Sequence, residues 1–329
     1  MVVSIKTNLL NDIHMQLFKK ETNIDFIGKR YLALVFSAAL IAAGAYSLAT
    51  KGLNYGIDFT GGTKVELEYQ NEVQIVDVRS MLEQDYPEAV VQFFGSTKDV
   101  LIRVPLSEDN SSAAVSTNIV SLLKANTTDQ LDVRSVEFVG PQFGQELFEK
   151  GVLALLYALI GVMIYVAFRF EWKFSLGSVA ALIHDVLITV GLFSVLSLEF
   201  TLPVLAALLA VIGYSLNDTI VVFDRIRENF RKLRESDTFD TMNVSINQTL
   251  PRTILTSLTT LLVLITLYVY GGEALSGFAA TLIIGVLIGT YSSIFVASPT
   301  VLGLGAKTED LIVEEVEKEG ADHPDMQRP

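Results

Sequence analysis

The stretch 202–223, LPVLAALLAVIGYSLNDTIVVF, decides the class of this chain, because it is long, apolar and carries one ionised side chain, Asp218. An α-helix rises about 1.5 Å per residue, so about 20 apolar residues cross a hydrocarbon core about 30 Å thick. Five more apolar runs of comparable length lie at 31–50, 152–168, 174–198, 253–271 and 274–304. Six such runs exclude a soluble globular enzyme and predict a polytopic α-helical membrane protein with six transmembrane helices.

Two segments outside these runs account for the net charge of the chain. The 329 residues carry a net charge of −13, of which residues 51–147 contribute −8 and residues 307–329 contribute −5. No basic surface is left for nucleic acid. The sequence has no cysteine, which excludes disulfides, thiolate catalysis and cysteine-ligated metals. We expect no metal site, no cofactor and no enzymatic activity.

Basic residues indicate how the chain is threaded through the membrane. Five Lys or Arg residues precede the first run and five follow the fourth, between Arg225 and Arg234. The links at 198–203 and 272–273 contain none. The positive-inside rule then places both termini in the cytoplasm and residues 51–148 outside. The predicted organisation is a cytoplasmic segment 1–30, a first span 31–50, an extracytoplasmic domain 51–148, five spans within 149–304, and an acidic tail 305–329 that we expect to be disordered.

The first run has an alternative interpretation as a cleaved signal peptide. Residues 43–45, Ala-Gly-Ala, have the small-x-small form of a cleavage site. However, the apolar stretch continues to Thr50, and the polar leader of thirty residues is too long for an ordinary signal peptide. A retained signal-anchor helix is favoured.

The extracytoplasmic segment reads as one small α+β domain. Alternation predicts strands at 64–69, 90–94, 100–104 and 133–139, and helical spacing predicts helices at 73–84 and 111–123. The order β-α-β-β-α-β is that of a ferredoxin-like unit. The domain has no histidine and no phosphate-binding glycine loop, which favours a binding or lever domain.

Turn-forming residues stand where this domain meets the membrane. The entrance, 56–63, reads GIDFTGGT, and the exit, 139–147, reads VGPQFGQEL. Glycine permits a sharp change of chain direction, and a capping or turn role is favoured for the carboxylate at the entrance. The candidate hinge between domain and membrane comprises Gly56, Asp58, Gly61, Gly62, Pro141 and Gly144.

Ionisable residues inside a bilayer are costly and normally face a bundle interior or a water-filled path. Asp218 lies seven residues before Arg225, about 10 Å from the cytoplasmic edge. Arg252 and Thr256 open the fifth run at a comparable depth, so opposite charges of neighbouring helices could meet there. These three residues are the candidate proton relay, with a static ion pair between helices as the alternative. The secondary candidates for the relay are His184, Asp185 and Asn217.

Four motifs in this chain resemble the SecF family, whose members are membrane subunits of the bacterial Sec protein-export apparatus. The motifs are the entrance 56–63, the exit 139–144, the stretch GYSLNDTIVVFDR at 213–225 and the stretch SINQTLPRT at 245–253. The double-glycine motif is shared with the sister subunit SecD, and the likeness runs from about Phe26 to Pro299.

The resemblance implies a member of the resistance-nodulation-division (RND) superfamily that forms one half of a pseudo-symmetric bundle. It implies a bacterial cytoplasmic (inner) membrane protein with SecD and the SecYEG channel as partners. Such an assembly would act on a translocating unfolded polypeptide after the SecA steps, driven by the proton-motive force. In this family an Asp on the fourth helix and an Arg–Thr pair on the fifth are implicated in proton transport, which corresponds to Asp218, Arg252 and Thr256.

Two other functions are compatible with buried charges in six spans. An RND-type exporter of small molecules or lipids would use the same proton chemistry, although such exporters typically carry two six-helix halves in one chain. A passive scaffold would stabilise the channel complex without moving protons.

Overall fold

The structure, a computed structural model, describes residues 22–105, 112–127, 129–233 and 236–306. Six of its helices are long and apolar enough to cross a membrane, which confirms the six predicted spans and a multi-pass membrane protein. The predictions for the first 21 residues and for the tail from residue 307 lie outside the described residues. The spans are α2 (Arg30–Thr50), α6 (Pro141–Arg169), α7 (Trp172–Val195), α8 (Leu202–Lys232), α9 (Thr238–Tyr270) and α10 (Glu273–Ser292), the last continued by the π-helical turn η1 (Ser293–Ala297) and by α11 (Ser298–Gly303).

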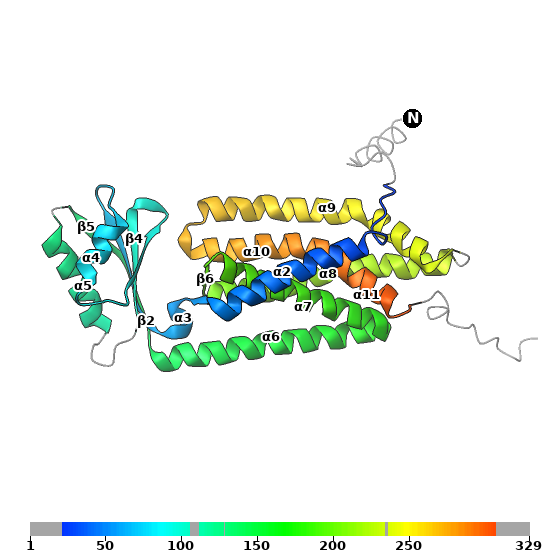
Figure 1. The fold of residues 1–329 in the computed structure, drawn as a ribbon, viewed down its shortest axis with the longest axis horizontal. Helices are drawn as coiled ribbons and strands as arrows, with labels where there is room; N and C mark the ends of the chain where they lie inside the picture. Colours follow the sequence, from blue (N-terminus) through cyan, green and yellow to red (C-terminus); the bar gives the residue numbers. More distant parts are fainter. Residues whose placement is uncertain (1–21, 106–111, 128, 234–235, 307–329) are drawn as a thin grey trace, which may run out of the picture.

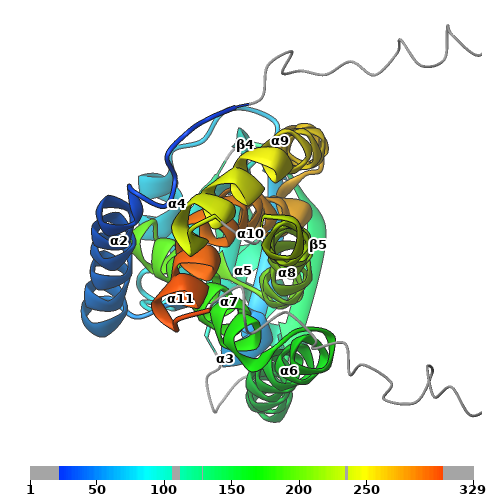
Figure 2. The same cartoon turned by 90° about the vertical axis from the view of Figure 1, so that its right-hand side faces the viewer.

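The spans run side by side along one axis, with the sheet domain at one end of the bundle (Figure 1). Seen along that axis, α2, α6 and α9 lie at the outside (Figure 2). Accordingly, α7, α8 and α10 bury about half of their residues, whereas the three outer helices bury far fewer. The polar residues of α7, α8 and α10 are therefore the ones removed from lipid by the chain itself.

Two helices are longer than their apolar runs. The expected turn at 139–147 is wrong, because α6 already begins at Pro141, and proline is well suited to the first turn of a helix. The fifth span begins at Thr238 and contains Pro251 within the helix, whereas its apolar run begins at 253. Hydropathy marks the lipid-facing part of a helix, and the polar turns beyond it stay helical because they pack on their neighbours.

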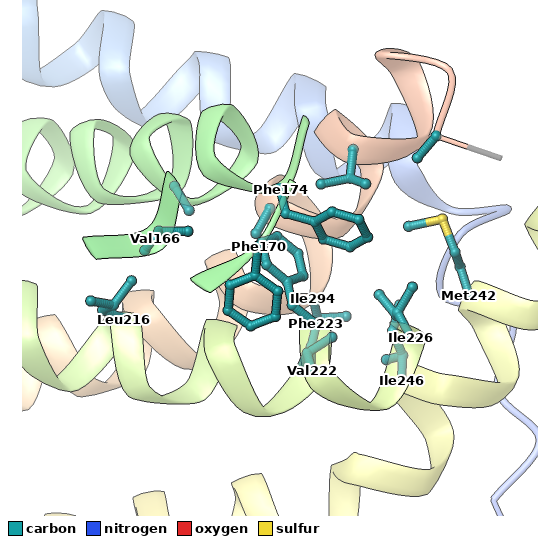
Figure 3. Packing of buried hydrophobic residues seen from close by; sticks show 14 of the residues in the cluster. Val166, Phe170, Phe174, Leu216, Val222, Phe223, Ile226, Met242, Ile246 and Ile294 are labelled. Atoms are coloured by element: carbon teal, nitrogen blue, oxygen red, sulfur yellow. The ribbon is translucent and has the colours of Figure 1, made fainter. Parts of the chain in front are cut away.

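Aromatic packing fixes the helix ends that lie farthest from the sheet domain. Figure 3 shows Phe170, Phe174 and Phe223 packed together between the end of α6, the start of α7 and α8. The ring centroids of Phe174 and Phe223 are 5.0 Å apart in an edge-on arrangement. Met242 and Ile246 of the polar half of α9 complete this cluster. The extensions of α8 and α9 beyond their apolar runs therefore belong to the core.

The domain between α2 and α6 contains a four-stranded antiparallel sheet with the strand order β3-β4-β2-β5. Its helices pack on one face, where Val65 and Ile102 meet Val78 and Ile119. The opposite face carries charged side chains and is turned toward the outer ends of α9 and α10 across a cavity. The elements are β2 (Gly62–Tyr69), α4 (Ile75–Leu82), β3 (Val90–Phe94), β4 (Ser96–Val104), α5 (Ser112–Asn126) and β5 (Leu131–Val139).

Short elements join this domain to the bundle. The strand β1 (Asn54–Tyr55) pairs in parallel with β6 (Glu199–Phe200), the link between α7 and α8. The one-turn helix α3 (Ile57–Thr60) then leads into the sheet. The domain is thus tied to the start of α8, the helix that carries Asp218.

Candidate functional site

Asp218 is buried between helices and incompletely satisfied. Its side chain is 4% exposed, and its Oδ2 atom has no hydrogen-bond partner. The carboxylate interacts with the charge of Arg252 on α9 and with the hydroxyl of Thr290 on α10. Thr290 in turn shares a hydrogen bond of 2.7 Å with Ser257 of α9. This carboxylate therefore lies where α8, α9 and α10 meet and keeps one oxygen free.

The other two members of the predicted relay lie on the outer surface of α9. Arg252 is exposed, and among the described residues it forms no ion pair with Asp218 at 4.0 Å or less. Thr256 is exposed too, and its hydroxyl donates to the backbone carbonyls of Arg252 and Thr253, both at 3.0 Å. Asn217 points away from the bundle interior and is also exposed. The structure thus brings the Arg252 charge near Asp218 without direct contact.

The pair His184 and Asp185 of α7 is buried and fully hydrogen-bonded. His184 Nδ1 lies 2.9 Å from Asp185 Oδ1, and its Nε2 lies 2.9 Å from the Ser37 hydroxyl of α2. Ser215 of α8 and Ser292 of α10 donate to Asp185 Oδ2 at 2.5 and 2.8 Å. One carboxylate and one imidazole therefore connect four helices.

The two buried carboxylates differ in what their surroundings allow. Asp185 has partners on both oxygens, whereas Asp218, one helical turn after Ser215, has a free one. Three further buried hydroxyls without partners, those of Thr219, Thr241 and Thr253, lie on α8 and α9. Buried polar groups are nearly always satisfied, so the free oxygen of a buried carboxylate is unusual.

Sequence reasoning missed the hydroxyl partners in this site. Ser37, Thr290 and Ser292 lie far from the carboxylates in sequence, and no local pattern connects them. The one available signal was the spacing of Ser215 and Asp218, which places both on one face of a helix.

The predicted hinge residues meet at the start of α8. The backbone N–H of Leu202, the first residue of that helix, donates to Asp58 Oδ2 at 2.7 Å, and Gly56 N–H donates to the Phe200 carbonyl at 2.9 Å. Gly62 has a φ of 136°, and a Cβ there would lie 2.6 Å from the Val104 carbonyl oxygen. The carboxylate at the domain entrance thus caps a helix from another segment, which is a structural role.

Gly144 meets the same junction from the other side. A Cβ at Gly144 would lie 2.7 Å from the Phe59 carbonyl oxygen, so α6 approaches the backbone of α3 closely. Gly61 has a φ of 72° and ends α3. Pro141 starts α6 one turn before this contact.

An ion pair crosses the same junction. Arg103 Nη1 of β4 lies 2.8 Å from Glu199 Oε1 of β6, and both side chains are largely buried. Burial raises the pKa of Glu199 above its ordinary value, and the charge of Arg103 opposes that rise. Neither residue stands out in the sequence.

Comparison with known proteins gives a consistent result. The family model described as "Protein export membrane protein SecD/SecF, C-terminal" matches residues 119–307, and the "SecD/SecF GG Motif" matches residues 46–73. The protein translocase subunit SecF of Vibrio alginolyticus is 47% identical over 94% of this chain and 99% of its own length. That of Escherichia coli O157:H7 is 44% identical over 92% of this chain and 94% of its own length.

Solved structures add the arrangement in space. A crystal structure of SecDF, a translocon-associated membrane protein from Thermus thermophilus, matches with a TM-score of 0.80 and 37% identity over 91% of this chain. SecDF in a super-membrane-facing form matches with a TM-score of 0.65 and 38% identity over 90% of this chain. In each case this chain spans only 41% of the matched chain. Its fold, motifs and relatives place it in one group: the chain belongs to the SecD/SecF family of protein export membrane proteins.

Proposed function

We propose that this chain is a translocase subunit that acts with a SecD partner and the SecYEG channel and uses the proton-motive force to complete polypeptide export. Two findings support the partner. The curated relatives are named protein translocase subunit SecF, and the SecDF chains are more than twice as long as the part that this chain matches. The exposed faces of α6 and α9 leave room for a second six-helix half.

The observation that carries the proposal is the buried Asp218 carboxylate with a free oxygen beside the charge of Arg252. A lone buried charge is costly, so protonation and closer pairing with Arg252 are alternative ways to relieve the cost. One proton that crosses the membrane releases about 2.3 kcal/mol per 100 mV. Since about 1.4 kcal/mol changes an equilibrium tenfold, this is enough to switch between two helix arrangements.

In this mechanism Arg252 and Thr256 of α9 take part in the relay from the adjoining helix. The secondary candidates for the relay are His184, Asp185 and Asn217. The first two are already fully hydrogen-bonded, and Asn217 points away from the bundle interior. The reaction is transport, and no cofactor other than the proton is needed.

The domain 51–148 is then a lever outside the bacterial cytoplasmic membrane, with both termini inside. Its element order and its strand order β3-β4-β2-β5 support a ferredoxin-like fold. The hinge residues Gly56, Asp58, Gly61, Gly62, Pro141 and Gly144 would transmit helix movement to it. The spans within 149–304, together with α2, would form half of an RND-type bundle.

The test is Asp218→Asn in membrane vesicles that contain the partner subunits, with SecA and ATP held constant. The proton-driven completion of export is expected to stop. Asp224→Asn is the matched control, because Asp224 lies on the same helix but is 43% exposed and pairs with Arg169. If Asp218→Asn exports as well as the control, the relay is wrong and a passive scaffold is favoured. Solute hypersensitivity without precursor accumulation in a deletion strain would favour a small-molecule exporter.

A further inference from the structure

Arg103 is a buried cation of the extracytoplasmic domain that depends on the membrane bundle for its counter-charge. It lies directly opposite Lys64 in the sheet, so two cations share one face. Lys64 pairs with Glu66 and Glu137 of the domain itself, at 3.1 and 3.2 Å. Among the described residues, the ion-pair partner of Arg103 is Glu199, at 2.8 Å.

This dependence is strong because the guanidinium has little else to bind. Its side chain is 7% exposed, its Nε has no hydrogen-bond partner, and its Nη2 reaches Gln92 at 3.5 Å. A buried charge that loses its partner is strongly destabilising. When the domain separates from the bundle, Arg103 must therefore find water or another anion.

Glu199 stands three residues before the first residue of α8. Within these residues Glu199 forms the ion pair with Arg103, and the Leu202 N–H donates to Asp58. The ion pair and the helix cap therefore meet at the start of α8. From Leu202 to Asp218 the helix rises by about 24 Å. One continuous helix therefore connects the domain contacts to the buried carboxylate.

The junction has free space beside it. A cavity of about 470 Å³ separates the sheet from the ends of α9 and α10, and Asp58 and Glu199 themselves line it. Gln92, Phe93 and Leu101 line its domain side, and Tyr268 and Gly277 line its membrane side. A domain that is held at this junction can therefore tilt into the adjoining cavity when the junction opens.

We propose that the Arg103–Glu199 ion pair, together with the Asp58 cap on α8, is a latch that must alternately close and open for the proton-driven step of export. This inference rests on the proposed function. Arg103, Glu199 and Asp58 are positioning residues, which set where the domain sits and touch no transported group.

The chain has no cysteine, so a cysteine pair can be introduced without background. The double variant Arg103→Cys/Glu199→Cys is studied in vesicles with its partner subunits, before and after treatment with a bifunctional thiol cross-linker, because an Arg and a Glu that meet at their ends hold their backbones too far apart for a direct disulfide. Cross-linking should slow the proton-driven stage by about tenfold or more relative to the untreated double variant, the change that about 1.4 kcal/mol produces. The SecA and ATP stage should not change, and Arg103→Cys alone should not respond to the cross-linker.

Charge variants test the latch without a cross-link. Arg103→Gln and Glu199→Gln should each slow the proton-driven stage, and Arg103→Glu/Glu199→Arg should restore it, which loss of folding alone would not do. An unchanged rate of proton-driven export after cross-linking, or normal export in both single charge variants, overturns the latch. If wild type shows no proton-driven stage at all, the proposed function fails instead.

Discussion

Replacing each of the two buried carboxylates by alanine should lower the free energy of unfolding by clearly different amounts. Asp185→Ala removes three side-chain hydrogen bonds, from His184, Ser215 and Ser292. Hydrogen bonds between membrane helices average about 0.6 kcal/mol, which gives a loss of about 2 kcal/mol. The two serine hydroxyls also lose an acceptor in a buried site, and such penalties bring the loss to about 4 kcal/mol.

Asp218→Ala should cost less than about 1 kcal/mol. One of its oxygens has no partner, and Thr290 keeps its hydrogen bond to Ser257. The free energy of unfolding is measured in mixed micelles by titration with a denaturing detergent, with helical circular dichroism as the signal. Asp185→Asn, which retains one carbonyl acceptor, should fall between wild type and Asp185→Ala. Equal losses for the two alanine variants, or a larger loss for Asp218→Ala, would refute the distinction between a fixed and a switchable carboxylate.

Three further predictions concern single positions. Burial raises the pKa of Tyr69 to about 12, so its contribution to domain stability is intact below pH 10 and is lost as pH rises through 12; a phenolate absorbance titration of Tyr69→Phe should lack that step. Gly62→Ala should cost about 3 kcal/mol of stability, because the φ of Gly62 is 136° and a Cβ would lie 2.6 Å from a carbonyl oxygen. Gly95→Ala should cost about 1 kcal/mol, because Gly95 has a φ of 85° but a Cβ there would meet nothing within 4 Å. Hydrogen exchange of β2 and β4 compares the two variants. Pro251→Ala should stiffen α9 by restoring a backbone hydrogen bond, slowing proton-driven export at unchanged thermal stability; faster export would contradict this.

The sequence predicts the spans well because each must satisfy one dominant requirement, apolar side chains over the thickness of a bilayer. The ends of the helices depend instead on packing against neighbouring helices. Thr238 begins α9 because the helix continues into the buried cluster around Phe174, which includes Met242 and Ile246. A hydropathy pattern does not report this packing between helices. The strands of the outer domain were predictable for a similar reason, since alternation follows directly from a sheet with one covered face.

The sites were only partly predictable. An aspartate in an apolar run is conspicuous because ionisable residues are rare there, so the sequence alone identifies Asp218 and Asp185 as candidates. What separates them is their partners, and Ser292 lies 107 residues from Asp185. Arg103 and Glu199 are ordinary charges in polar segments, and only the fold brings them within 2.8 Å.

The distribution of contacts around Asp218 indicates which helix moves in the proposed mechanism. α8 is held in its middle by the Ser215–Asp185 hydrogen bond and at the end farthest from the sheet domain by buried aromatic side chains. α9 has few buried residues in its membrane part, and Pro251 leaves the Asn247 carbonyl without its usual helical donor. Thr22 donates to that carbonyl instead, at 3.3 Å. Because α9 carries Arg252 just after this break and ends beside the cavity under the sheet, its movement would change both the surroundings of Asp218 and the space beneath the domain.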